Sequence, residues 1–311
     1  MLAMKIQHAP RVVPARLGAA WLTEGFRLFH RQPLIWFLTL FAYWAGLVIL
    51  AMVPLLGLVA PLVLTPGLGF GFVALALAVD RQEMPMPLLL VSGFRSDKAK
   101  PLLQMGLLYF LGLVVVLVLA WMVDGGSLFR AMSQSPEELT DPTISMDPSL
   151  QWGLIVAVLG YLPVLMAFWF APQLLVWGQF PVVKALFYSF FAVWRNRAAF
   201  FVYGLSWLAL FIFLSLLVSA FTSLAGLSQQ AVFTLLMPIT FILIAVAHGS
   251  FYASTRDVFG PMPEMPGPDL RLVSSQDSIR PRNAGPSVDS NSAPPHDPDR
   301  PSESNSPEKK D

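Results

Sequence analysis

Six windows of this chain lack Asp, Glu, Lys and Arg, and each is long enough to form a helix that crosses a membrane. The hydrocarbon core of a bilayer is about 30 Å thick and requires roughly 20 apolar residues in a helix. The chain is 55% hydrophobic and 13% charged, whereas soluble proteins are about 25% charged. We therefore predict an all-α fold, a transmembrane helical bundle of six spans. The spans are expected at residues 34–55, 57–79, 101–123, 153–176, 198–220 and 231–254.

Basic residues gather in alternate connections between these spans. Five Lys and Arg residues precede the first span, four lie between the second and third, and three lie between the fourth and fifth. The other connections are poor in basic residues, and the long one at 124–152 contains Arg130 beside five acidic residues. Short loops rich in Lys and Arg stay in the cytoplasm. We therefore expect both termini on the cytoplasmic side.

A basic segment containing aromatic residues precedes each odd-numbered span. Helical spacing places the arginines of residues 15–31 opposite its Trp and Phe side chains, as in helices that lie in the membrane interface. Similar but weaker patterns occupy residues 87–100 and 181–197. We therefore predict interfacial helices on the cytoplasmic side, with their aromatic face in the acyl region. The residues hypothesised to contact lipid headgroups are Arg27, Arg31, Arg95 and Lys98.

These segments also indicate three units, each made of an interfacial helix and two spans. Phe26, Phe94 and Phe190 align when the units are superposed. Chance identities and the usual basic character of cytoplasmic loops account for the same pattern without a duplication. Both explanations stay open.

The composition changes abruptly near residue 257. Pro and Ser supply 20 of the last 55 residues, and large apolar side chains are few. Such a segment buries too little apolar surface to offset the entropy of ordering it. We therefore predict an integral membrane domain at 1–256 and a disordered cytoplasmic tail at 257–311.

His248 is the one titratable imidazole inside a predicted span. It could act in a proton relay, but the spans offer no carboxylate partner, which favours a neutral imidazole hydrogen-bonded to a neighbouring helix. Small residues at helical spacing in the second and sixth spans predict close helix packing, within one chain rather than between two copies. The residues hypothesised to pack in this way are Gly67, Gly71, Ala245 and Gly249.

The stretch from residue 169 to 204 is the most distinctive part of the sequence. Its pattern resembles an uncharacterised family of multi-pass inner-membrane proteins of betaproteobacteria, and more loosely the membrane domain of some bacterial glycerophosphodiester phosphodiesterases. The similarity covers residues 5–260, and the catalytic domain of that phosphodiesterase has no counterpart in this sequence. The resemblance implies a location in the bacterial inner membrane and no chemistry. The residues that carry it are Trp169, Pro172, Leu174, Ala185, Ser189, Asn196 and Tyr203.

The sequence contains no recognisable set of catalytic or metal-binding residues, and it contains no cysteine. We therefore expect a non-enzymatic scaffold or accessory protein, with no cofactor, no metal and no nucleic-acid partner. The expected partners are membrane lipids with anionic headgroups and an envelope protein that the sequence does not identify. The alternative is a transporter or channel for an uncharged or amphiphilic solute. Its path would be lined by Gln104, Gln173, Gln179 and Ser206.

Overall fold

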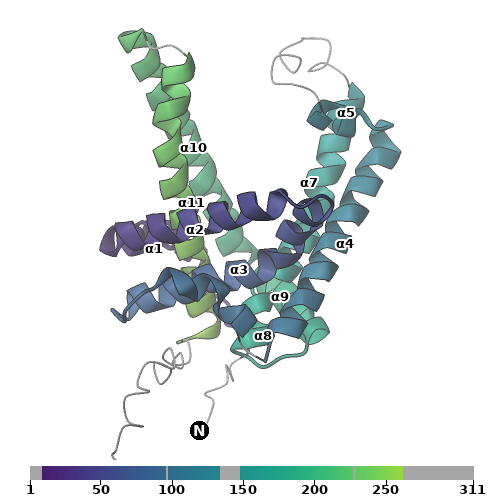
Figure 1. Ribbon diagram of the computed structural model, residues 1–311, viewed down its shortest axis with the longest axis vertical. Helices are drawn as coiled ribbons and strands as arrows, with labels where there is room; N and C mark the ends of the chain where they lie inside the picture. Colours follow the sequence, from purple (N-terminus) through teal and green to yellow (C-terminus); the bar gives the residue numbers. More distant parts are fainter. Residues whose placement is uncertain (1–8, 96, 134–147, 227–228, 262–311) are drawn as a thin grey trace, which may run out of the picture. The chain divides into compact units, whose positions relative to one another are not determined.

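The computed structural model of the protein describes residues 9–95, 97–133, 148–226 and 229–261. All regular structure in these residues is helical, with ten α-helices, one 3-10 helix and no strand (Figure 1). The predicted all-α fold is confirmed. In chain order the elements are α1 (Leu17–Arg31), α2 (Pro33–Ala51), α3 (Leu56–Asp80), η1 (Pro87–Arg95), α4 (Ala99–Asp124), α5 (Ser127–Ser133), α7 (Pro148–Phe168), α8 (Ala171–Val176), α9 (Val182–Arg195), α10 (Arg197–Ala225) and α11 (Gln229–Phe259).

Among the described residues, six helical segments are long and apolar enough to cross a membrane. They are α2, α3, α4, the consecutive pair α7 and α8, α10, and the part of α11 from Leu236 to Phe259. Each coincides with one predicted window, so the six apolar helices are confirmed. The pair α7 and α8 is interrupted between Phe168 and Ala171, because Pro172 has no N–H to donate to the carbonyl oxygen of Phe168, four residues earlier, and its ring would clash with that carbonyl.

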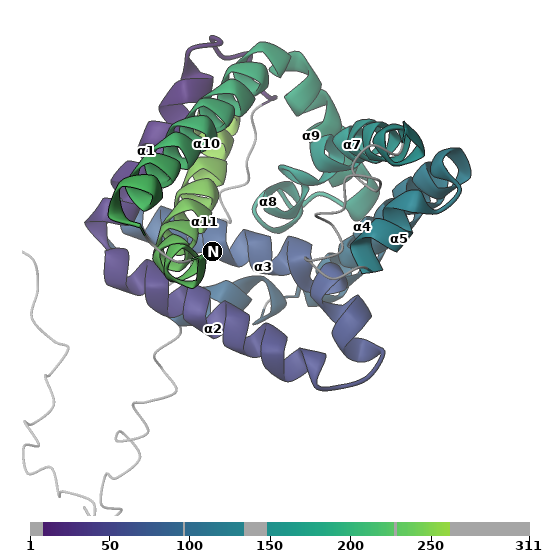
Figure 2. The same ribbon diagram turned by 90° about the horizontal axis from the view of Figure 1, so that it is seen from above.

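The helices α2 and α3 form a hairpin with a tight turn. Leu55, in that turn, has a φ of 63°, and Gly57 lies directly against the backbone of Ala51. Figures 1 and 2 show this pair running across the direction of α10 and α11. The element before the pair, α1, and the element after it, η1, both contact α3. The turn therefore reverses the chain, so that α3 leads back to α1, the helix that precedes the hairpin.

The amphipathic helix α1 buries its apolar face inside the protein. Trp21 and Leu28 are 1% and 0% exposed, and α1 packs against α10 and α11. Gly18 touches the backbone of α10 and Gly25 touches that of α11, so the absence of side chains at these positions allows the helices to approach closely. The prediction that the aromatic face of this helix enters the lipid is therefore wrong.

The helix α9 has the opposite arrangement. Its small residues are buried against the protein, whereas Val183, Phe187 and Trp194 are 75%, 59% and 54% exposed. The buried side is in contact with α7 and α8. The aromatic side of α9 is therefore uncovered in the described part of the protein.

The last helix extends beyond the predicted end of the membrane domain. Val258 and Phe259 are buried residues of α11, so the predicted boundary at residue 257 falls inside a helix. Burial therefore continues past Arg256 and Asp257, the charged residues that follow the predicted span at 231–254. Most of the predicted tail, residues 262–311, lies outside the described residues.

Candidate functional site

A cluster of ion pairs joins α1, the end of α3 and the last turns of α11. Glu24 and Arg27 pair within α1, and Arg27 also donates a hydrogen bond to Asp80 at 2.6 Å. Arg256 of α11 donates to Glu24 at 2.8 Å and lies 3.4 Å from Asp80. The arginine–carboxylate cluster therefore ties together three elements that are distant in sequence. Its members are Glu24, Arg27, Arg31, Asp80, Arg256 and Asp257.

Two aromatic side chains complete the hydrogen bonding of the carboxylates. Tyr252 donates its hydroxyl hydrogen to Asp80 at 2.8 Å, and the indole N–H of Trp21 donates to Asp257 at 3.0 Å. Arg31 adds contacts to the carboxylate and carbonyl oxygens of Asp80. With three carboxylates and three guanidinium groups, the cluster is electrically balanced. Partly buried charges require this kind of pairing.

The ion pairs shift the pKa values of two side chains of α1, Glu24 and Arg27. The hydrogen bond from Arg27 lowers the pKa of the Glu24 carboxyl below its ordinary value of 4.5; partial burial opposes this, and Arg256 lowers it further. The same bond raises the pKa of the Arg27 guanidinium. Both groups therefore stay charged near neutral pH.

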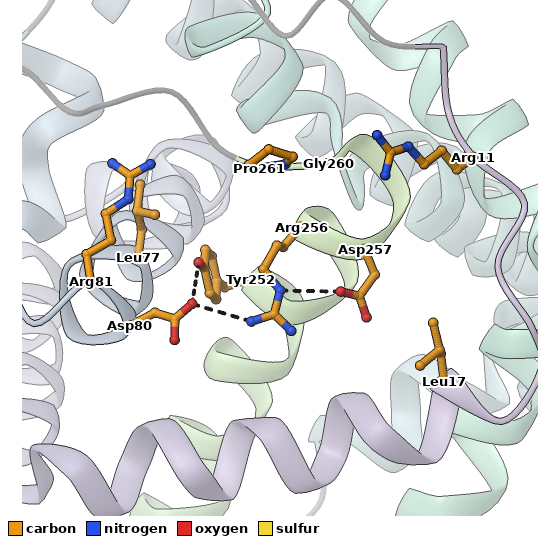
Figure 3. Close-up of a pocket in the computed structure, with 10 residues that line it drawn as sticks. All are labelled: Arg11, Leu17, Leu77, Asp80, Arg81, Tyr252, Arg256, Asp257, Gly260 and Pro261. Atoms are coloured by element: carbon orange, nitrogen blue, oxygen red, sulfur yellow. Dashed lines mark hydrogen bonds and ion pairs between the residues drawn. The ribbon is translucent and has the colours of Figure 1, made fainter.

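Beside the cluster lies a pocket of about 500 Å³ (Figure 3). The N-terminal arm supplies Arg11, the end of α3 supplies Asp80 and Arg81, and α11 supplies Tyr252 and Arg256. In Figure 3, Gly260 and Pro261, which follow α11, lie between Arg81 and Arg11. The pocket is thus bordered by three guanidinium groups from three separate parts of the chain.

The four basic residues predicted to contact headgroups occupy two different environments. Arg27 and Arg31 belong to the cluster and bind Asp80. Arg95, the last residue of η1, is exposed, and Lys98 lies 3.5 Å from the carboxylate of Asp97. The structure therefore brings Arg27 and Arg31 together at Asp80, and it places Arg95 and the half-buried Lys98 apart from them, near the start of α4.

The four residues predicted to pack helices all lie in tight contacts within the chain. A side chain at Gly67 would overlap the ring of Phe94, and one at Gly71 would overlap the backbone of Leu90; both partners belong to η1. Gly249 faces Gly25 of α1, and Ala245 is fully buried. The close approach on the second span is thus to the 3-10 helix rather than to another span.

His248 hydrogen-bonds to the carbonyl oxygen of Ile244 in its own helix at 2.8 Å. Its ring also lies 4.0 Å from the ring of Phe72, measured between centroids. The sequence predicted a hydrogen bond from the imidazole to a neighbouring helix. The imidazole instead bonds to the backbone carbonyl four residues earlier in its own helix, a group that any helix offers. Neither contact supplies a proton acceptor for a relay.

The residues of the hypothetical solute path do not meet. Gln104 and Gln179 are exposed, and Gln173 is buried with no hydrogen-bond partner for its carbonyl oxygen among the described residues. The Ser206 hydroxyl donates to Val202 of its own helix. Between residues 9 and 261, as far as these are described, no hydrogen bond joins any two of the four.

The residues that carry the family resemblance form structural contacts. Asn196, between α9 and α10, accepts from the backbone N–H of Val13 and donates to the carbonyl oxygen of Arg11. Ser189 accepts from the backbone N–H of Phe170, which connects α8 to α9. Trp169 and Tyr203 hydrogen-bond to Ser254 and Ser250 of α11, respectively. These side chains therefore tie the N-terminal arm to the junction of α9 and α10, α9 to the junction of α7 and α8, and both Trp169 and α10 to α11.

Sequence reasoning did not identify the arginine–carboxylate cluster. The predicted spans ended at residues 79 and 254, just short of Asp80 and Arg256. One signal was available in the sequence. Asp80 and Arg256 carry opposite charges and follow the second and sixth predicted spans, whose ends were both predicted to lie on the cytoplasmic side of the membrane. A pairing of the two ends would have followed only from knowing that α3 and α11 pack against each other and against α1.

The helices and the charged cluster at their ends define a multi-pass membrane protein. The chain is 36% identical over 251 residues to a probable inner membrane protein of Burkholderia thailandensis, and the alignment covers 80% of this chain and 93% of that protein. The chain belongs to the family of that probable inner membrane protein. No family model and no solved structure matches the chain.

This relationship confirms the predicted resemblance to betaproteobacterial inner-membrane proteins and the expected inner-membrane class. The looser resemblance to the membrane domain of glycerophosphodiester phosphodiesterases stays a prediction. The relative's name assigns no reaction, substrate or partner.

Proposed function

We propose that this protein is a non-enzymatic scaffold or accessory protein of the inner membrane that binds lipids at the cytoplasmic surface through α9. The observation that carries this proposal is the exposed aromatic side of α9, formed by Val183, Phe187 and Trp194. Lys184 and Arg195 border this side. Helices that lie in the interface place aromatic residues in the acyl boundary and basic residues at the phosphates.

The basic residues of α9 and its neighbours are arranged for this environment. The Lys184 ammonium lies 4.6 Å from the centre of the Phe180 ring, and the Arg197 guanidinium lies 5.9 Å from that of Trp194. Such contacts hold a cation beside an aromatic group without neutralising its charge. Arg95 and Lys98 extend the proposed headgroup contacts to the start of α4.

Lipid analysis of the protein purified in mild detergent tests the proposal. Replacing Phe187 and Trp194 together by Ser should reduce the phospholipid retained per protein, because the aromatic anchors are lost. The matched control, Phe187→Leu with Trp194→Phe, keeps the apolar face and should retain wild-type lipid. Equal lipid content in all three proteins would contradict a lipid-binding role for α9.

The transporter alternative predicts a different measurement. Proteoliposomes containing a transporter or channel would release a trapped uncharged solute such as glycerol faster than protein-free vesicles. We expect equal rates, because Gln104, Gln173, Gln179 and Ser206 form no common path. A faster release that is abolished by Gln173→Leu would favour the transporter.

We also propose that both termini lie in the cytoplasm, since the basic connections all fall on one side. The chain lacks cysteine, so single cysteines at exposed positions report sidedness directly. Met84→Cys, between α3 and η1, should react with a membrane-impermeant maleimide only after permeabilisation. Leu224→Cys, at the end of α10, should react in cells whose inner membrane is intact. The reverse result would invert the topology.

A further inference from the structure

We infer that α2 and α3 form a hairpin that enters the bilayer from one surface and turns back inside it, so that its uncovered face contacts the acyl chains of one leaflet. Both helices are long and apolar enough to cross a membrane, but their contacts place the turn between them inside the hydrocarbon. The inference goes beyond the proposed function, because it involves no residue of α9. It depends on the proposed topology only for the identity of the leaflet, which is the cytoplasmic one.

The end of α3 and the start of α4 lie at the same membrane surface. Asp80, the last residue of α3, is paired with two arginines of α1. The helix α4 begins at Ala99, between Lys98 and Lys100. Charged groups of this kind belong at the surface of a bilayer rather than in its core. Depth can therefore be counted from Asp80 along α3 and from Ala99 along α4.

The contact between α3 and α4 lies at very different distances from these two ends. Gly106 of α4 lies directly against the backbone of Val63 of α3. Gly106 is seven residues after Ala99, about 10 Å along α4, whereas Val63 is 17 residues before Asp80, about 25 Å along α3. Because one contact has one depth, α3 travels about 25 Å while it moves at most about 10 Å away from the surface. The helix α3 is therefore strongly inclined.

The contacts of η1 give the same result at the middle of α3. Gly67 lies against the ring of Phe94, and Phe94 is followed directly by the exposed Arg95. Gly67 is 13 residues before Asp80, about 20 Å along α3. In an upright span this position would lie deep in a hydrocarbon core about 30 Å thick, not beside a residue that adjoins an exposed arginine. Figures 1 and 2 show the corresponding arrangement, in which α2 and α3 also run across the direction of α4 and α7.

The turn between α2 and α3 suits hydrocarbon rather than water. Residues 45–64 contain no polar side chain, and Met52 and Leu55 are 78% and 84% exposed. Backbone groups inside a bilayer must find partners within the protein, and Pro54 has no N–H to satisfy. The amides of the turn that donate to carbonyl oxygens of residues 49–55 are those of Met52, Val53, Leu56, Gly57, Leu58 and Val59.

The uncovered face of α2 is the surface that the acyl chains contact. Large apolar side chains recur on one side of this helix at helical spacing, whereas Trp36 and Leu40 on the opposite side are fully buried. Thr39 donates to the carbonyl oxygen of Ile35 in its own helix. Because the hairpin lies at the depth of the hydrocarbon, acyl chains are the molecules that surround this face. The residues that form it are Leu34, Leu38, Phe41, Val48, Ile49 and Met52.

Cysteine labelling of the full chain tests the position of the turn, since the chain has no cysteine of its own. The variant is Leu55→Cys, and the matched control is Leu224→Cys, a leucine of similar exposure at the end of α10. A membrane-impermeant maleimide should react with Leu55→Cys at least about tenfold more slowly than with Leu224→Cys, because the reactive thiolate is charged and hydrocarbon disfavours it. The difference should persist after permeabilisation, when Met84→Cys reacts.

Reaction of Leu55→Cys at the rate of either control would overturn the inference, because it would place the turn in water. If Met84→Cys and Leu224→Cys exchange their behaviour, the proposed sidedness fails. Slow reaction of Leu55→Cys would then still support the hairpin, in the opposite leaflet. The two failures are therefore distinguishable.

Nitroxide labels on the same cysteines in proteoliposomes separate a turn inside the bilayer from a crowded turn at its surface. The label at Leu55→Cys should be relaxed mainly by oxygen, which concentrates in hydrocarbon, and the label at Leu224→Cys mainly by a water-soluble nickel complex. Relaxation mainly by nickel at Leu55→Cys would overturn the inference even if the maleimide reacts slowly. A label at Phe41→Cys should be relaxed by oxygen without spin–spin broadening. Broadening would show a second copy against this face of α2 and would overturn its assignment to acyl chains.

Discussion

The helices α1 and α9 have the same pattern in the sequence and opposite surroundings in the structure. Both are amphipathic, both carry basic residues beside Trp and Phe, and both precede a long apolar helix. The apolar face of α1 is buried against α10 and α11, whereas the aromatic face of α9 is exposed. A hydrophobic face therefore does not by itself determine whether a helix meets lipid or protein.

The position of the small residues accounts for the difference. In α1, Gly18 and Gly25 lie on the same face as Trp21 and Leu28, so the apolar face can approach neighbouring backbones. In α9, the small residues Ala185, Ser189 and Ala192 lie opposite the aromatic ones. Close packing between helices follows the small residues, and the large apolar side chains of α9 are left outside.

The largest expected effect comes from truncating equivalent apolar residues on the two helices. Leu28→Ala on α1 should lower the free energy of unfolding by about 3 kcal/mol, because it removes a fully buried side chain and leaves a cavity. Phe187→Ala on α9 should change it by less than about 0.5 kcal/mol in detergent, because the ring is exposed. Reversible unfolding in detergent measures both values. Similar losses in the two variants would show that α9 is buried by a contact outside the described residues.

A smaller effect should follow from filling the close approach of α1 to α10. A Cβ atom at Gly18 would overlap the carbonyl oxygen of Ala199, so Gly18→Ala should cost about 2 kcal/mol by forcing the helices apart. Gly204 of α10 has open space around it, and Gly204→Ala should be neutral or stabilising because alanine favours the helix. The unfolding temperatures of the two variants measure the difference. A tolerant Gly18→Ala variant would argue against the packing of α1 shown here.

Charge and hydropathy predicted the helical class and the six apolar helices because each of these depends on a local run of residues. The surroundings of α1 depend on its contacts with α10 and α11, which lie about 180 or more residues away along the chain. The same limit applies to the cluster: Glu24 and Arg27 form an ordinary i, i+3 pair, but their contacts with Asp80 and Arg256 depend on packing. The sequence does show that the small residues Gly18 and Gly25 lie on the apolar face of α1. Their position distinguishes α1 from α9, whose small residues lie opposite the aromatic ones.

The smallest expected effect concerns the polar edge of α1, which α9 lacks. Glu24→Gln removes a carboxylate that accepts hydrogen bonds from Arg27 and Arg256, and it should cost about 1 kcal/mol at neutral pH, since the arginines stay partly hydrated. The matched control is Glu83→Gln, because that carboxylate is largely exposed and lies 3.8 Å from Arg81. Its cost should be within about 0.3 kcal/mol.

The pH dependence identifies the cause. The pKa of Glu24 is lower in the folded protein than its ordinary value of 4.5, chiefly through the hydrogen bond from Arg27. The folded state therefore favours the charged form, and the stabilisation is complete above pH 4.5 and is lost as the pH falls through the lower native pKa. The difference in unfolding free energy between wild type and Glu24→Gln should be constant from neutral pH down to about pH 5 and shrink below pH 4.5. A difference that persists unchanged at the lowest pH at which the wild type still folds would show that the shape of Glu24, rather than its charge, holds α1 to α11.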